Sequence, residues 1–135
     1  MENRTIVLYV DDNPKSSRLL TSVLEECGFR IITINDPAEA LGLCRKMSFD
    51  IALLDYDMPG ITGAQLAEEI KFLMPSLPVV MISGCANLPP TELVFVDAHF
   101  GLGTCLDDLL WTMRVLAAPP TIVDQRSAAD CADST

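Results

Sequence analysis

Ile51-Ala52-Leu53-Leu54-Asp55-Tyr56-Asp57-Met58-Pro59-Gly60 is an apolar run that ends on a carboxylate just before a turn. A second run, Ile6-Val7-Leu8-Tyr9-Val10, ends in the same way on Asp11 and Asp12. Continuous apolar runs of this length are typical of strands buried on both faces of a parallel sheet. An ionised carboxylate at the end of a buried strand costs several kcal/mol in desolvation unless a partner compensates it. The three carboxylates therefore indicate a shared site at one edge of a sheet.

Strand-like apolar runs alternate with helix-like patterns along most of the chain. Asn13-Pro14 and Asp36-Pro37 are typical helix starts, and Gly28 is a typical helix stop. Such alternation predicts an α/β fold: a doubly wound, five-stranded parallel sheet with helices on both faces. Ligands bind such sheets beyond the carboxyl ends of the strands, where the strand order reverses. The expected strands span residues 6–10, 29–34, 50–54, 77–82 and 98–102.

The last third of the chain follows this alternation less closely. Asn87-Leu88-Pro89-Pro90 breaks the chain after the fourth strand, and residues 91–96 are too β-branched to predict a helix. Thr104 is expected to cap a last helix that runs to about residue 116.

Length and composition limit the class of protein. A chain of 135 residues, half of them hydrophobic, has room for one domain with a single core. The composition shifts to Pro, Ser, Ala and Asp near the end, so we expect a folded domain at 1–117 and a disordered tail or linker stub at 118–135. A net charge of −10 argues against direct nucleic-acid binding, because displacing counterions from phosphates needs basic residues.

The sequence also bears on location. Its five cysteines lack metal-ligand spacing and are typical of reduced thiols. We find no signal-peptide pattern at the start, and no apolar stretch approaches the roughly 18 residues of a membrane span. We therefore expect a cytoplasmic protein that does not bind a membrane.

The clustered carboxylates indicate a particular chemistry. If strands one and three flank the reversal of strand order, Asp11, Asp12 and Asp55 become neighbours, with Ser83 one strand further along. Mg²⁺ or Mn²⁺ suits such a group, since hard cations prefer oxygen ligands and relieve the repulsion between carboxylates. A carboxylate in such a site can act as a nucleophile and form an aspartyl phosphate. Ser83 can donate its hydroxyl to a phosphoryl oxygen.

Three segments stand out in this order: Val10-Asp11-Asp12-Asn13-Pro14, Leu53-Leu54-Asp55-Tyr56-Asp57-Met58-Pro59-Gly60-Ile61-Thr62-Gly63 and Val79-Val80-Met81-Ile82-Ser83-Gly84. Together they resemble the receiver domain of two-component response regulators. The resemblance covers residues 5–117 and implies a flavodoxin-like sheet with strand order 2-1-3-4-5.

The resemblance assigns a role to each site residue. Asp55 would be the phosphoacceptor, and Asp11 and Asp12 would position Mg²⁺ together with the backbone carbonyl of Asp57. Ser83 would be the switch hydroxyl. A histidine kinase or phosphotransfer protein would supply the phosphoryl group, and the signal would pass to a downstream protein or a second copy through the last helix and fifth strand.

The fifth strand departs from the family pattern, which has an aromatic residue there and a lysine shortly after it. In Ala98-His99-Phe100-Gly101-Leu102, His99 occupies the aromatic position and Leu102 the lysine position. Leucine cannot donate a hydrogen bond to a phosphoryl oxygen or neutralise its charge. Lys15, one turn into the first helix, is the nearest candidate to replace the missing cation.

Two other hypotheses follow from the same residues. The chain could be a degenerate receiver that keeps the metal pocket but serves as a phosphorylation-independent interaction module, because Leu102 breaks the switch. It could also be a small phosphohydrolase with an Asp nucleophile, since Asp57 supplies a second acid. That enzyme class needs an inserted cap over the substrate, and the sequence contains no insertion of that kind.

Overall fold

A computed structural model of the chain describes residues 4–84, 87–101 and 104–118. Five parallel strands form one sheet in the order β2-β1-β3-β4-β5, as predicted. The strands are β1 (Ile6–Val10), β2 (Arg30–Ile34), β3 (Ile51–Asp55), β4 (Val79–Ser83) and β5 (Ala98–Gly101). The helices are α1 (Pro14–Glu26), α2 (Pro37–Cys44), α3 (Gly63–Leu73) and α4 (Leu106–Ala117), with the 3₁₀ helix η1 (Pro90–Leu93) between β4 and β5.

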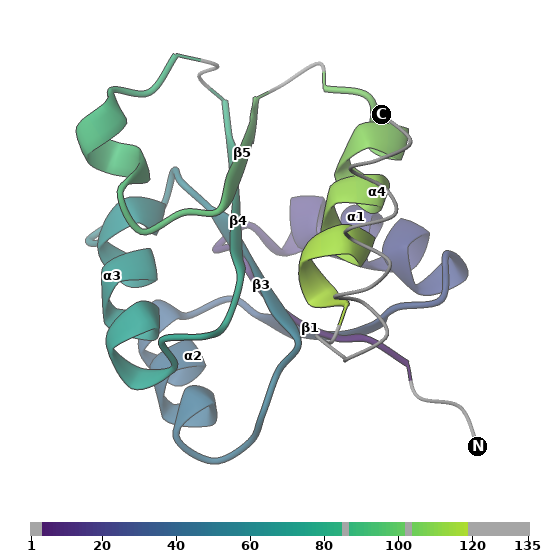
Figure 1. Cartoon of the computed structure of the whole chain (residues 1–135), viewed down its shortest axis with the longest axis horizontal. Helices are drawn as coiled ribbons and strands as arrows, with labels where there is room; N and C mark the ends of the chain where they lie inside the picture. The colour runs from purple at the N-terminus through teal and green to yellow at the C-terminus, as the bar shows by residue number, and fades with distance from the viewer. Residues whose placement is uncertain (1–3, 85–86, 102–103, 119–135) are drawn as a thin grey trace, which may run out of the picture.

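The sheet separates two layers of helices. Figure 1 shows α2 and α3 on one side of the sheet and α1 and α4 on the other. Successive residues of β1 point to opposite faces, so Leu8 packs in the core on the α2–α3 side, whereas Val7 and Tyr9 pack on the α1–α4 side. Both faces of β1 and β3 are therefore buried, which is why their sequences read as continuous apolar runs.

The predicted helix starts are confirmed in α1 and α2, but not in α4. The Asn13 side chain accepts hydrogen bonds from the backbone N–H groups of Lys15 and Ser16, and Asp36 accepts one from Ala38. The prediction that Thr104 caps the last helix is wrong, because the N-cap residue is Cys105 and it makes no side-chain capping bond. The Thr104 N–H instead donates to the Gly101 carbonyl, which holds this residue close to the end of β5.

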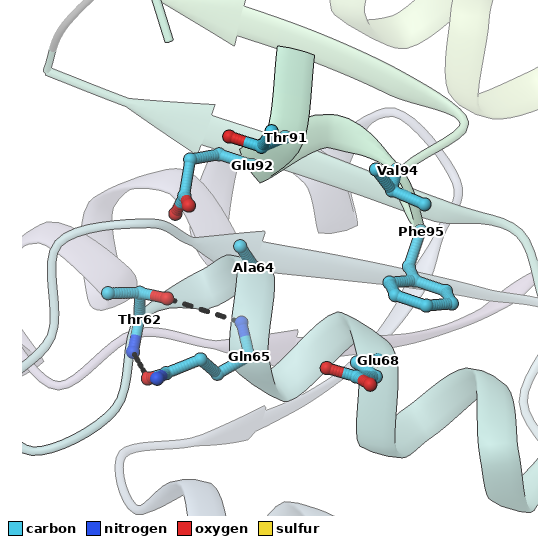
Figure 2. Close-up of a pocket in the computed structure, with 8 residues that line it drawn as sticks. All are labelled: Thr62, Ala64, Gln65, Glu68, Thr91, Glu92, Val94 and Phe95. Carbon is cyan, nitrogen blue, oxygen red and sulfur yellow. Dashed lines mark hydrogen bonds between the residues drawn. The ribbon is translucent and has the colours of Figure 1, made fainter. Parts of the chain in front are cut away.

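In the described part of the connection from β4 to β5, residues 87–97, the helical element is the short η1, consistent with the absence of a predicted helix at 91–96. Figure 2 shows the hollow that η1 leaves against α3, about 310 Å³ in volume. The Tyr56 hydroxyl donates to the Glu92 carboxylate at 2.8 Å and so ties η1 to the loop after β3. Asp97 accepts from the Lys71 ammonium and from the Val79 N–H, both at 2.8 Å, which holds the end of the connection against α3 and β4.

Two sequence predictions concern residues that the structure does not describe. Leu102 lies outside the described residues, and so do residues 119–135 of the predicted tail. Within the described part of the chain, no helix is both long enough and apolar enough to span a bilayer.

Candidate functional site

The predicted carboxylates meet at the carboxyl edge of the sheet. Since β1 and β3 are adjacent, with Val10 opposite Leu54, the residues that follow them come together. Asp11, Asp12 and Asp55 each present one carboxylate oxygen, and these three oxygens lie within 4.8 Å of one another. They line a cavity of about 540 Å³, whose walls are formed by Tyr9, Asp11, Asp12, Asn13, Ser16, Leu20, Asp55, Asp57, Ile82, Ser83 and Gly84.

Asp11 is the most deeply placed of the three carboxylates, with 5% of its surface exposed. Its Oδ2 accepts a hydrogen bond from the Tyr9 hydroxyl at 2.9 Å, and its Oδ1 accepts one from the Asn13 N–H, also at 2.9 Å. Burial, followed by the nearby charge of Asp11, raises the pKa of Tyr9 far above its ordinary value, so this hydroxyl remains a donor. The Asn35 side-chain amide donates to the Asp11 backbone carbonyl at 2.6 Å.

The position of Asp55 in the cluster raises the pKa of its carboxyl group. Burial is the largest cause that raises its pKa, and the charges of Asp11 and Asp57 add to it. A hydrogen bond from the Asp57 N–H to Asp55 Oδ1, at 3.2 Å, acts in the opposite direction. The net result places the pKa of Asp55 at about 7. Three converging carboxylates, one of which ionises only near neutral pH, fit a divalent cation well, because the cation relieves their mutual repulsion.

Asp57 and Ser83 also lie at this edge. Asp57 lines the cavity, and its Oδ2 accepts a hydrogen bond from the Gly84 N–H at 3.1 Å, which joins the loop after β3 to the end of β4. Ser83 is only 1% exposed and lines the same cavity. The structure therefore brings both residues to the carboxylate cluster, as the sequence predicted.

His99 and Lys15 are not part of the cavity wall. His99 lies in β5 opposite Met81, and its buried Nε2 has no hydrogen-bond partner among the described residues. Lys15 is exposed near the start of α1. Among the residues that the structure describes, the wall of this cavity contains no lysine or arginine.

Sequence reasoning missed three residues that shape the site: Tyr9, Asn35 and Gly63. A Cβ atom on Gly63 would lie 2.8 Å from each of three atoms: the Asp55 carbonyl oxygen, the Tyr56 Cα and the Met81 Sδ. The Gly63 N–H also donates to the Tyr56 carbonyl at 3.0 Å, so α3 begins in direct contact with the end of β3. For Tyr9 a signal did exist, since it interrupts an aliphatic run two residues before Asp11 and so shares its face of the sheet.

Comparison with known proteins identifies the family. The family model of the response regulator receiver domain matches residues 7–98, and the chain belongs to this family, a signal-transduction module rather than an enzyme. It is 38% identical over 115 residues to the sensor histidine kinase RcsC of Salmonella typhi, an alignment that covers 83% of this chain and 12% of RcsC. It is 39% identical over 111 residues to the two-component response regulator ARR12 of Arabidopsis thaliana, covering 81% of this chain and 17% of that protein. The chain thus spans less than a fifth of the length of either relative.

Solved structures agree with this assignment. The response regulator TrrA of Thermotoga maritima, in complex with Mg²⁺ and BeF, superposes with a TM-score of 0.77 at 26% identity, covering 83% of this chain and 98% of TrrA. A second structure holds TrrA in complex with the histidine kinase ThkA, with a TM-score of 0.77 at 26% identity, covering 84% of this chain and 99% of the other.

Proposed function

We propose that this receiver domain accepts a phosphoryl group on Asp55 from a histidine kinase or phosphotransfer protein, in a reaction that depends on Mg²⁺. The observation that carries the proposal is the convergence of Asp11, Asp12 and Asp55 within 4.8 Å at the edge of the sheet. The structures of TrrA with Mg²⁺ and BeF, and with a histidine kinase, support it by similarity.

The residues that would hold the cation are the carboxylates of Asp11, Asp12 and Asp55 together with the backbone carbonyl of Asp57. Mn²⁺ should replace Mg²⁺, since both prefer an octahedral set of oxygen ligands. When bound, the cation would neutralise charge on the phosphoryl oxygens. It would also favour the ionised form of Asp55, whose pKa of about 7 leaves it partly protonated at neutral pH.

The chain's own residues would perform the transfer. A carboxylate oxygen of Asp55 forms the new O–P bond while the bond from phosphorus to the donor nitrogen breaks, and the donor imidazole keeps that electron pair. The hydrogen bond from the Asp57 N–H holds Asp55 Oδ1 in place. Ser83 lines the same cavity and would donate its hydroxyl to a phosphoryl oxygen after transfer.

The output surface that we propose is α4 with the adjacent β5. Three large apolar side chains of α4 are exposed: Leu106 (39%), Trp111 (68%) and Val115 (50%). Exposed apolar groups on one element favour contact with another protein, either a downstream partner or a second copy of the chain. His99 in β5 would respond to phosphorylation from the switch position that the family resemblance assigns to it.

A degenerate receiver is the second candidate, favoured by the lack of a cationic side chain among the described residues of the cavity wall. Incubation with Mg²⁺ and acetyl phosphate or phosphoramidate, followed by intact-mass measurement, separates the two. Phosphorylation adds about 80 Da, the mass of one phosphoryl group, and Asp55→Asn removes this species. A wild-type mass that stays constant under these conditions would favour the degenerate receiver. The phosphohydrolase hypothesis is disfavoured by the family assignment.

A further inference from the structure

Tyr9 is a polar residue near the carboxyl end of the buried strand β1. It is 3% exposed and packs in the core on the α1–α4 side, yet its hydroxyl reaches the carboxylate cavity. Alternate residues of a strand share a face, so Tyr9 and Asp11 lie on the same side of the sheet. This register places the hydroxyl 2.9 Å from Asp11 Oδ2.

Asp11 is held at both oxygens. Oδ2 accepts from the Tyr9 hydroxyl and Oδ1 from the Asn13 N–H, each at 2.9 Å. The Asn13 amide belongs to the backbone at the start of α1, whereas the Tyr9 hydroxyl is a side-chain group that could be lost by substitution. Without it, Oδ2 would lose this hydrogen-bond donor at a position where Asp11 is only 5% exposed. The carboxylate could then turn about its last torsion, which is broad and weakly restrained.

We propose that Tyr9 is a positioning residue of the metal site, whose hydroxyl fixes the Asp11 carboxylate in the orientation that faces Asp12 and Asp55. This role rests on the proposed function, because it presumes that the three carboxylates bind a divalent cation. Hydrogen-bond partners of metal-binding groups orient them, and their loss commonly weakens metal binding by 10–100-fold. The effect of Tyr9 acts on Asp11 alone and requires no contact between Tyr9 and the cation.

A purely structural role for Tyr9 is the competing explanation. Its ring packs among the apolar residues of the α1–α4 side, and phenylalanine would fill the same space. Loss of the hydroxyl also leaves more negative charge on Asp11, which by itself would favour a cation. A positioning role therefore predicts weaker metal binding in Tyr9→Phe, whereas a packing role predicts no change and the charge effect alone predicts tighter binding.

The chain provides a matched control, because it contains two tyrosines. The Tyr56 hydroxyl donates to Glu92 in η1 and lines no part of the carboxylate cavity. Tyr56→Phe thus deletes the same atom at a different place. We would titrate the whole chain with Mn²⁺ and follow free Mn²⁺ by electron paramagnetic resonance, with Mg²⁺ in competition. The wild type, Tyr9→Phe, Tyr56→Phe and Asp12→Asn would be compared, with thermal unfolding of each metal-free variant as a test of folding.

We expect Tyr9→Phe to weaken Mn²⁺ and Mg²⁺ binding about tenfold. Tyr56→Phe should bind like the wild type, and Asp12→Asn should lose binding. A second readout comes from ¹⁹F NMR of chain labelled with 3-fluorotyrosine, in which the two signals are assigned with the two Tyr→Phe variants. Mg²⁺ should shift the Tyr9 signal if the Tyr9 hydroxyl stays bonded to Asp11 when the cation binds, and this readout complements the binding constants.

The outcomes separate this role from the proposed function. If Tyr9→Phe binds as tightly as the wild type or more tightly, while Asp12→Asn loses binding, the metal site stands and the positioning role is wrong. If the wild type itself binds neither cation, the metal-dependent function and the role of Tyr9 are both overturned. A Tyr9 signal that does not respond to Mg²⁺ in a chain that binds it would also refute the role.

Discussion

Gly63 is the position at which one added methyl group should disturb the site most. In Gly63→Ala, the new Cβ would lie 2.8 Å from the Asp55 carbonyl oxygen, from the Tyr56 Cα and from the Met81 Sδ. The Met81 side chain could move aside, but the other two atoms belong to the backbone. The start of α3 must therefore shift away from β3. This shift lengthens the hydrogen bond that the Gly63 N–H donates to the Tyr56 carbonyl.

The expected loss in the free energy of unfolding of Gly63→Ala is about 1–3 kcal/mol, the typical cost of forcing a methyl group into a close-packed interior. Because one of the two contacted backbone atoms belongs to Asp55, the same substitution should also press on the end of β3 and weaken Mn²⁺ binding. The matched control is Gly42→Ala in α2, where a Cβ would meet no atom within 4 Å. Alanine in a helix is more stable than glycine by about 0.5–1 kcal/mol, so this control should change stability in the opposite direction.

Urea unfolding of both variants, monitored by far-UV circular dichroism, tests the prediction. We expect the unfolding midpoint to fall in Gly63→Ala and to rise in Gly42→Ala, with slopes that match the wild type. A Gly63→Ala variant as stable as the wild type would refute the close contact between α3 and the end of β3. Unchanged Mn²⁺ binding in a destabilised variant would show that this contact supports the fold without positioning Asp55.

Three further predictions concern the carboxylate cluster. Mg²⁺ or Mn²⁺ binding should be weak, and should be lost in Asp12→Ala and in Asp55→Ala; calorimetric binding that survives both substitutions unchanged would contradict the assigned site. The raised pKa of Asp55, about 7 in the folded chain, predicts that the metal-free protein is stabilised below the ordinary pKa of an aspartate and loses that contribution as pH rises through about 7. Urea unfolding across this pH range should show a falling free energy of unfolding in the wild type but not in Asp55→Asn. An equal dependence on pH in both proteins would show that another group titrates. Leu102→Lys should speed phosphorylation by acetyl phosphate and enlarge phosphate-induced NMR shifts, because a charge-assisted bond is worth about 1.5–3 kcal/mol. Wild-type behaviour on both counts would show that the missing lysine does not limit this domain.

Local patterns in the sequence were sufficient to predict the elements of the fold. The apolar runs ending at Val10 and Leu54 are buried on both faces, and strands buried on both faces are typically apolar throughout. The caps Asn13 and Asp36 act within three residues of their own position, so nearby sequence is enough to identify them. The cap of α4 was misplaced by one residue, since the Thr104 N–H bonds to the Gly101 carbonyl at the end of β5 and the helix begins after Cys105.

The strands and the three carboxylates of the site could therefore be predicted from the sequence, and the strand order could be predicted from the family resemblance. How these groups affect one another follows from their positions in the folded chain. The pKa of Asp55 depends on its burial and on Asp11, 44 residues away in the chain, and the contact at Gly63 depends on the distance between α3 and β3. Electrostatic and packing energies change steeply over an ångström, and a pattern of residue types carries no information at that scale.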